Sequence, residues 1–195
     1  MPRSARTLVD RGYYHVLTRG NDKKTIFRDD LDYKKFLLLL EDSLSLFDVR
    51  LLHFCLMPNH LHLLACSLKA LDLPLFMKRI LQRYAAYFKK NYDAVGFVFQ
   101  NRYKSILIQR ESYLLECARY IERNPLRSGI VKDPGEYRWS SYSFYSYGAT
   151  QRIVNLVNPL YEELGNTEQE RQSKYRAYIL EERPYERIVD SYLKM

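Results

Sequence analysis

The sequence predicts an α+β domain built on a ferredoxin-like antiparallel sheet, followed by a helical C-terminal extension. Segments with strand and helix patterns follow one another in the order β-α-β-β-α-β, which is the order of the ferredoxin-like fold. Only Pro58 and Asn59 join the second and third strand segments. A connection this short excludes a crossover and requires an antiparallel hairpin. A chain of 195 residues has room for one such domain and an appendage.

Four stretches have the composition of strands. Residues 13–18 are rich in β-forming residues and lie between Gly12 and Gly20, which predicts the first strand. Residues 49–57 form a second apolar run, and the chain returns from His60 as the third strand. Residues 96–100 and 103–108 are expected to be extended and to complete the sheet.

Apolar residues at helical spacing predict helices over residues 30–47, 73–92, 111–123 and 168–182. Asp29 and Asp30 can cap the first of these helices. The third is expected to stop at Asn124-Pro125, because a proline disfavours helical geometry in the preceding residue. Thr167 to Glu170 resembles a capping box, and Pro184 should separate the fourth helix from a short last one.

The charge balance indicates a polyanionic partner. The chain has 31 Lys and Arg against 23 Asp and Glu, which gives a formal charge of +8 and a pI near 9.3. Nucleic acid is the simplest partner for such an excess. Many of the 18 tyrosines lie beside Arg or Lys, a pattern that suits contacts to phosphates and bases. Packing is nevertheless the ordinary role of any single tyrosine.

The cysteines and the N-terminus favour a cytoplasmic, nucleoid-associated protein without disulfides. Three cysteines are an odd number, and they form no CxxC motif. Residues 1–10 are polar and no apolar segment follows them, so no signal peptide is expected. The apolar run over residues 37–40 is far too short to span a bilayer.

His60 and His62 form the central motif of the chain. Residues i and i+2 of a strand point to the same face, so these two imidazoles should lie side by side. Such a pair can supply two ligands to a divalent metal, although ordinary strand histidines would give the same pattern. A zinc site with Cys55 depends on the hairpin register, and Cys66 would lie roughly 13 Å from His62. His15, in the first strand, is expected to be a core histidine.

The helix predicted over residues 111–123 can supply a nucleophile and an oxygen ligand together. Tyr113, Cys117, Tyr120 and Asn124 fall on one stripe of it. A phenol, with a pKa near 10, is a poor nucleophile at neutral pH, but a metal that polarises a phosphodiester makes the phosphorus more electrophilic. Attack by tyrosine gives a covalent phosphotyrosine, so the strand can later be rejoined without ATP. The sequence has no P-loop motif.

These residues resemble the single-tyrosine HUH (His-hydrophobic-His) transposases, and most closely their REP-associated tyrosine transposase subgroup. The resemblance rests on His60-Leu61-His62 after Met57-Pro58-Asn59, and on four supporting stretches in family order. These stretches are Thr18-Arg19-Gly20-Asn21, Phe99-Gln100-Asn101-Arg102-Tyr103-Lys104, Tyr120-Ile121-Glu122-Arg123-Asn124-Pro125-Leu126-Arg127 and Tyr137-Arg138-Trp139-Ser140-Ser141-Tyr142. Together they cover about residues 12–145.

The resemblance implies a role for each motif residue. His60, His62 and Asn124 match the metal ligands, with Mg²⁺ or Mn²⁺ as the ion, and Tyr120 matches the nucleophile. The implied substrate is single-stranded DNA beside a hairpin, a REP-type palindrome in this subgroup, cleaved and rejoined through a 5′-phosphotyrosine. The HUH-type catalytic domain is expected over residues 1–148, and residues 149–195 form the helical extension. The candidates for DNA phosphate contact are Lys23, Lys24, Arg79, Arg83, Arg102, Lys104, Arg119, Arg123 and Arg127.

The sequence leaves several alternatives open. A nicking endonuclease of the same family would cleave without rejoining, and a domesticated relative would bind hairpin DNA without catalysis. Tyr113 lies on the same stripe as Tyr120, but it has no asparagine partner one turn later. Both a monomer and a homodimer are compatible with the family, and the role of the extension is open.

Overall fold

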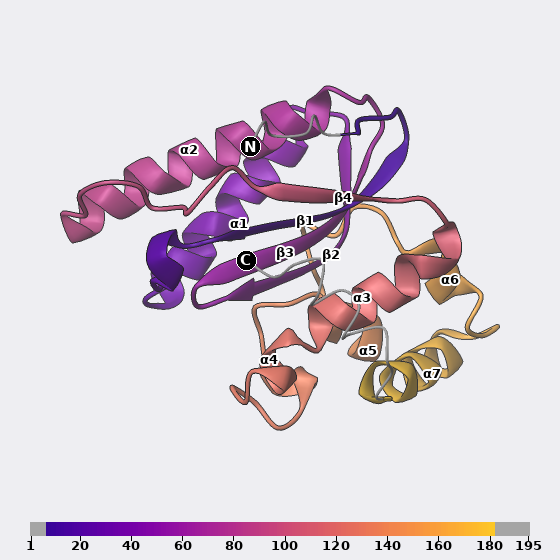
Figure 1. Ribbon diagram of the computed structural model, residues 1–195. Coiled ribbons are helices and arrows are strands. Elements are labelled where there is room, and N and C mark those ends of the chain that lie inside the picture. The colour runs from indigo at the N-terminus through magenta and orange to yellow at the C-terminus, as the bar shows by residue number, and fades with distance from the viewer. Residues whose placement is uncertain (1–6, 182–195) are drawn as a thin grey trace.

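The computed structural model, which describes residues 7–181, contains a four-stranded sheet between two helical layers (Figure 1). The strand order is β2-β3-β1-β4, and every neighbouring pair is antiparallel. This is the ferredoxin-like topology, so the predicted fold class is confirmed. The strands are β1 (Gly12–Arg19), β2 (Val49–Met57), β3 (His60–Ser67) and β4 (Lys104–Ile108).

Two helices cover one face of the sheet. They are α1 (Asp30–Leu44) and α2 (Asp72–Tyr92), and they pack against each other as well as against β2. The side chain of Asp29 caps α1 by accepting hydrogen bonds from the backbone N–H groups of Leu31 and Asp32. Leu61 and Leu63 of β3 point into this layer and belong to its apolar core.

The opposite face is covered by α3 (Leu114–Glu122), which follows the short 3-10 turn η2 (Glu111–Tyr113). The predicted end before Asn124-Pro125 is confirmed, since α3 ends at Glu122 with Arg123 as its C-cap. The sequence did not predict the single turn that follows, α4 (Asn124–Arg127), before which Arg123 keeps helical angles (φ −81°, ψ −9°). Pro125 lies in the first turn of α4, where its missing N–H removes no helical hydrogen bond.

The C-terminal part adds short helices beneath α3 (Figure 1). They are η3 (Pro134–Glu136), α5 (Tyr142–Tyr147), α6 (Pro159–Glu162) and α7 (Glu168–Leu180). The sequence predicted α7, with the Thr167 hydroxyl accepting from the backbone N–H of Glu170, but it did not predict α5 and α6. The short last helix expected after Pro184 lies outside the described residues. Within residues 7–181, no helix has the length and apolarity needed to cross a bilayer.

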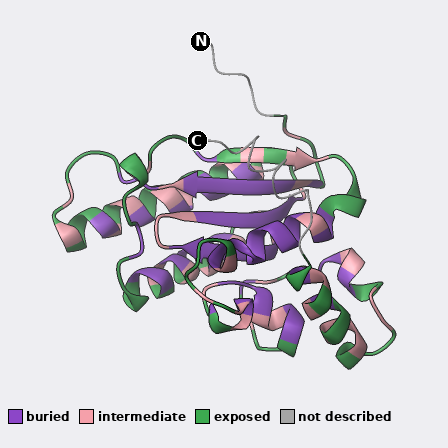
Figure 2. Ribbon diagram, turned by 60° about the horizontal axis from the view of Figure 1, so that its bottom comes forward, coloured by how far each residue is buried: buried purple, intermediate pink, exposed green. Residues whose placement is uncertain are grey.

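Later segments of the chain protect the β2 edge of the sheet. The backbone N–H of Leu56 donates to Trp139 O, Ser141 N donates to Phe54 O, and Asn155 N donates to Leu51 O. An uncovered edge strand would expose a row of unpaired backbone groups. The other edge, β4, is short and only partly covered, whereas β1 and β3 are almost wholly buried (Figure 2).

The turn after β1 is tied to the tip of the β2–β3 hairpin. Gly20 N donates to Asn59 O over 2.8 Å, and η1 (Asn21–Lys23) follows. A Cβ atom on Gly20 would lie 2.1 Å from the carbonyl oxygen of Lys24, so only glycine fits this turn. Residues 96–100, predicted to be extended, form bends and contribute only the isolated bridge between Gly20 and Phe99 to the sheet.

Candidate active site

His60 and His62 share the face of the sheet that α3 covers. Their ring centroids lie 5.1 Å apart and the rings are nearly perpendicular, at 87°. His62 is buried, whereas His60 at the start of β3 is partly exposed. The expectation that the two imidazoles lie side by side on one sheet face is therefore confirmed.

Tyr120 lies over this histidine pair in the same chain. Its ring centroid is 5.6 Å from that of His62, in an edge-to-face arrangement at 85°. The α3 position of Tyr120 brings it to the sheet together with Cys117 and Ile121, which belong to the same apolar cluster. The guanidinium carbon of Arg127 lies 5.2 Å from the centre of the Tyr120 ring and places a positive charge beside the phenol.

Each histidine of the pair is oriented through its Nδ1 atom. His60 Nδ1 lies 2.6 Å from Asn59 Oδ1, and His62 Nδ1 lies 2.9 Å from His15 Nε2. Asn59 Oδ1 can only accept, because Asn59 Nδ2 donates to Lys23 O, so Nδ1 of His60 carries the proton and its Nε2 the lone pair that a metal would use. The bond between His62 and His15 joins two ring nitrogens, and it leaves Nε2 of His62 outside the bond. Metal-binding histidines usually donate their second ring N–H to a neighbour in this way.

The environment keeps the pair uncharged at neutral pH. Burial lowers the pKa of His60 to about 4, and the positive charge of Arg19 acts in the same direction. Burial also lowers the pKa of His62 well below its usual value, with further contributions from His60, His15 and Arg127. Neutral imidazoles can bind a metal without first losing a proton.

Asn124 brings an amide to the same place. Its Nδ2 donates to Tyr120 O over 2.8 Å and approaches Ile121 O at 3.3 Å, so the amide oxygen takes no part in these two bonds. A hydrogen bond between the side chains of Asn124 and His60 raises the pKa of His60 slightly against the effect of burial. Across residues 7–181, no three His, Cys, Asp or Glu side chains form a metal-binding group. Among the described residues, a third protein ligand beside the two histidines would have to be of another type, and Asn124 is the one that the sequence predicted.

The structure does not favour a zinc site with Cys55. The hairpin register does place Cys55 opposite His62, but its thiol is fully buried and approaches Met57 Sδ at 3.7 Å. Burial raises the pKa of the Cys55 thiol well above its usual value. A metal binds the thiolate, so a thiol that holds its proton this strongly is a poor ligand.

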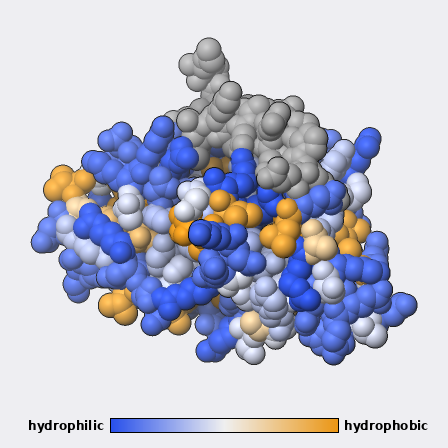
Figure 3. Space-filling model, turned by 90° about the horizontal axis from the view of Figure 1, so that it is seen from below, coloured by the Kyte–Doolittle hydropathy of each residue, from blue (hydrophilic) through white to orange (hydrophobic). Residues whose placement is uncertain are grey.

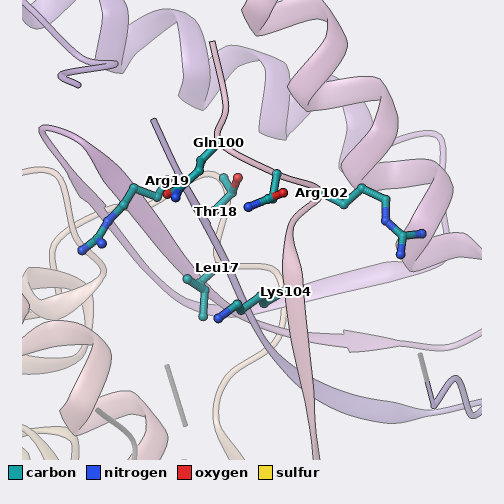
Figure 4. Close-up of a pocket in the computed structure, with 7 residues that line it drawn as sticks. Leu17, Thr18, Arg19, Gln100, Arg102 and Lys104 are labelled. Atoms are coloured by element: carbon teal, nitrogen blue, oxygen red, sulfur yellow. The ribbon is translucent and has the colours of Figure 1, made fainter. Parts of the chain in front are cut away.

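Exposed polar and basic residues gather at the end of the sheet that carries the histidine pair. Arg19 is the cross-strand partner of His60, and Asn59 donates to Lys23 O. A hollow of about 130 Å³ lies between the end of β1 and the segment that leads into β4 (Figure 4). No acidic residue lines it; the lining residues are Leu17, Thr18, Arg19, Gln100, Asn101, Arg102 and Lys104.

The basic residues predicted to contact DNA are not all brought together. Lys23, Lys24, Arg102, Lys104 and Arg127 are all exposed. Arg102 and Lys104 line the hollow beside the site, Arg127 lies next to Tyr120, and Lys23 and Lys24 are in the turn that contacts Asn59. Arg79 and Arg83 extend from α2, in the other layer, and both pair with Asp42 of α1.

The prediction of phosphate contacts for Arg119 and Arg123 is corrected by the structure. Arg119 is 0% exposed and Arg123 is 4% exposed. Arg119 pairs with Glu116, and Arg123 donates to the carbonyl oxygens of Ile179 and Leu180 at the end of α7. Arg119 also donates to Glu181 O, just after α7, so both cations fix the end of α7 to α3 and do not form part of a surface that DNA could reach.

Sequence reasoning missed the supporting roles of three residues. His15 was expected to be an ordinary core histidine, but it orients His62 and its ring lies 5.6 Å from that of Tyr120. Asn59 and Arg19 lie in motifs that the sequence analysis identified, but it assigned no role to either residue. In the structure, Asn59 orients His60 and the charge of Arg19 lowers the pKa of His60. These contacts depend on the register in which β3 pairs with β1, and the sequence did not show this register.

The buried histidines should make stability depend on pH. Burial lowers the pKa of His15 from 6.5 to about 4. The unfolded chain therefore binds a proton between these values that the folded chain does not, so the stabilisation is complete above pH 6.5 and is lost as the pH falls towards 4. For His15 alone, we expect the free energy of unfolding to fall by about 2 kcal/mol from pH 7 to pH 4.5. Urea titrations can measure this, and a His15→Asn variant should show a smaller fall; equal falls would contradict the assignment.

Comparison with known proteins agrees with the geometry. The family model for IS200-like transposases matches residues 8–124, which is more than half of the chain and includes all four site residues. The chain belongs to the IS200-like transposase family. The family predicted from the sequence motifs is thus confirmed, and no curated protein sequence matches this transposase.

One solved structure shows the same fold as this transposase. A REP-associated tyrosine transposase bound to a REP hairpin superposes with a TM-score of 0.64 at 15% identity, covering 78% of this chain and 90% of the other. A putative transposase from Deinococcus radiodurans gives a TM-score of 0.43 at 16% identity, covering 66% of this chain and 95% of the other. At these identities the first likeness shows the fold alone.

Proposed function

We propose that this transposase cleaves and rejoins single-stranded DNA beside a hairpin, in a metal-dependent reaction with Tyr120 as the nucleophile. The observation that carries the proposal is the position of Tyr120 over His60 and His62 within one chain. The family and the hairpin-bound relative support a hairpin substrate, of the REP type, for this chain as well.

Each site residue has a part in this reaction. The Tyr120 oxygen attacks the scissile phosphorus, the 3′-oxygen leaves, and the 5′-phosphate stays on the tyrosine. The cation of Arg127 beside the ring is suited to stabilise the negative charge that develops on the phosphate. Attack by a free 3′-hydroxyl on the phosphotyrosine then rejoins a strand and releases Tyr120.

The residues present fit a divalent cation. His60 and His62 offer uncharged imidazoles whose Nε2 atoms take no part in the Nδ1 bonds, and Asn124 offers an amide oxygen. Mg²⁺ or Mn²⁺ can accept this donor set when water completes the shell. When bound, the ion would polarise the scissile phosphate. His15 and Asn59 would hold the two rings in place through Nδ1.

A labelled hairpin oligonucleotide with single-stranded flanks tests the proposal. Incubation with Mn²⁺ should give a covalent protein–DNA adduct that survives denaturing electrophoresis, and a second oligonucleotide with a free 3′-hydroxyl should yield a joined product. An adduct without joined product would indicate a nicking endonuclease. Hairpin binding without any adduct would indicate a non-catalytic binding protein.

Basic residues near the site should set the salt dependence of DNA binding. We expect Arg102→Ala with Lys104→Ala to weaken hairpin binding and to reduce the slope of log K against log salt by roughly 0.7 to 0.9 for each phosphate contact removed. Fluorescence anisotropy at several salt concentrations measures this slope. Arg79→Ala with Arg83→Ala is the matched control, because that pair lies in the other layer and is bound to Asp42. If the two double variants lose the same affinity for the hairpin, DNA also contacts α2.

A further inference from the structure

A buried polar network lies behind the helix that carries Tyr120. Its centre is the carboxylate of Glu122, which is 0% exposed. Glu122 Oε1 lies 2.9 Å from His53 Nδ1 and accepts from the Ser141 hydroxyl over 2.6 Å, while Oε2 accepts from the Tyr175 hydroxyl over 2.8 Å. Asn158 Nδ2 lies 3.0 Å from the other nitrogen of His53. All five side chains are fully buried.

The network joins four separate parts of the chain to α3. His53 comes from β2, Ser141 from the segment that covers the β2 edge, Asn158 from the start of α6 and Tyr175 from α7. Burial of a carboxylate costs several kcal/mol, and a well-packed apolar group would often give equal stability. Stability alone therefore does not account for the network. What it does provide is a fixed position for α3 with both carboxylate oxygens satisfied.

Two paths connect the network to the residues of the candidate site, one along α3 and one across the sheet. Along α3, Glu122 is two residues from Tyr120 and two from Asn124. Along the sheet, His53 points to the α3 layer and is two residues from Cys55, which pairs with His62 across the strands. The bond between Glu122 and His53 therefore fixes the Tyr120 helix to the strand next to the histidine pair.

We infer that Glu122 is a positioning residue, and that α7 takes part in the site through the Tyr175 hydroxyl. The network holds the Tyr120 ring in register with His62 and His15. The effect on catalysis rests on the proposed function. The effect of the network on the position of the Tyr120 ring does not. Reacting groups tolerate little displacement: about 1 Å of misplacement can slow an enzyme by about 100-fold.

Tyr175→Phe and Tyr178→Phe form a matched pair of variants. Both remove one hydroxyl from α7 that donates to a glutamate of α3. Tyr175 donates to Glu122 in the network, whereas Tyr178 donates to Glu116 over 2.7 Å, outside it. Glu122→Gln is the stronger variant, since an amide cannot accept at both positions, and Tyr175→Phe keeps the test decisive if Glu122→Gln does not fold.

The histidine spectrum gives a readout that does not need activity. The chain has four histidines, and all of them report on this region. His53 lies in the network, His15 and His62 lie beside Tyr120, and His60 lies beside His62. In the metal-free protein, we expect Tyr175→Phe to shift the ring resonances of His53 and also those of His15 and His62, because the Tyr120 ring moves. Tyr178→Phe should leave all four unchanged. A shift confined to His53 would overturn the inference.

Adduct formation gives the catalytic readout. Glu122→Gln and Tyr175→Phe should slow it by about 10- to 100-fold while the Kd for the hairpin stays within about twofold, and Tyr178→Phe should match the wild type. Equal rates for the two tyrosine variants would overturn the catalytic part. An inactive wild type would refute the proposed function instead, and the histidine spectrum would still decide the geometric part.

Discussion

Tyr120→Phe is expected to abolish the covalent protein–DNA adduct while hairpin binding persists. The variant removes one oxygen atom from a ring that lies between α3 and the sheet, so its edge-to-face contacts with His62 and His15 can remain. Deletion of a nucleophile in other enzymes lowers the rate by about 10⁴- to 10⁶-fold, and we expect a loss of that order here. Denaturing electrophoresis of a labelled hairpin measures the adduct, and anisotropy measures binding.

The control for this variant is Tyr113→Phe. Tyr113 lies in η2 with 43% of its surface exposed, at the other end of α3 from Asn124. Its loss should leave the adduct yield unchanged. An adduct that persists in Tyr120→Phe and disappears in Tyr113→Phe would exchange the roles of the two tyrosines.

His60→Ala is expected to abolish metal-dependent cleavage with little effect on hairpin binding. His60 is the more exposed member of the pair, so its removal disturbs the core less than removal of His62. Loss of a direct ligand should weaken Mn²⁺ binding by more than the 10- to 100-fold typical of outer-shell changes. Calorimetric titration with Mn²⁺ and the adduct assay measure the two losses separately. Unchanged Mn²⁺ affinity would contradict the ligand assignment.

The same variant tests whether the site is formed within one chain. Tyr120 lies over the histidine pair of its own chain. A mixture of His60→Ala and Tyr120→Phe should therefore remain inactive, because no chain in it carries both an intact pair and a tyrosine. Recovered activity in the mixture would show that Tyr120 serves a partner chain.

Much of the fold follows from local patterns in the sequence. The two-residue link at Pro58-Asn59 required the hairpin, and the alternation after His60 placed both imidazoles on one face. The helical spacing between Tyr120 and Asn124 brought both residues to that face as well. These predictions depend on geometry within a few residues, where strand and helix periods are decisive.

The errors concern tertiary contacts. Arg119 and Arg123 have the residue type of phosphate ligands, but α7 buries both, and nothing in the sequence indicated where α7 would pack. His53 belongs to no motif, and Glu122 lies in a motif stretch that gave it no role of its own. Their pairing joins positions 69 residues apart, which local sequence patterns do not show. The sequence prediction ended the helix before Asn124-Pro125 but missed α4, although a proline is favourable in the first turn of a new helix.

The most direct test of the account is to find which residue carries the DNA. Wild-type protein is incubated with a flanked hairpin and Mn²⁺, the adduct is digested with nuclease and protease, and the modified peptide is sequenced by mass spectrometry. The account predicts a nucleotide 5′-phosphate on Tyr120, in the peptide that also holds Ile121 and Glu122. A phosphate on Tyr113 or any other residue would contradict it.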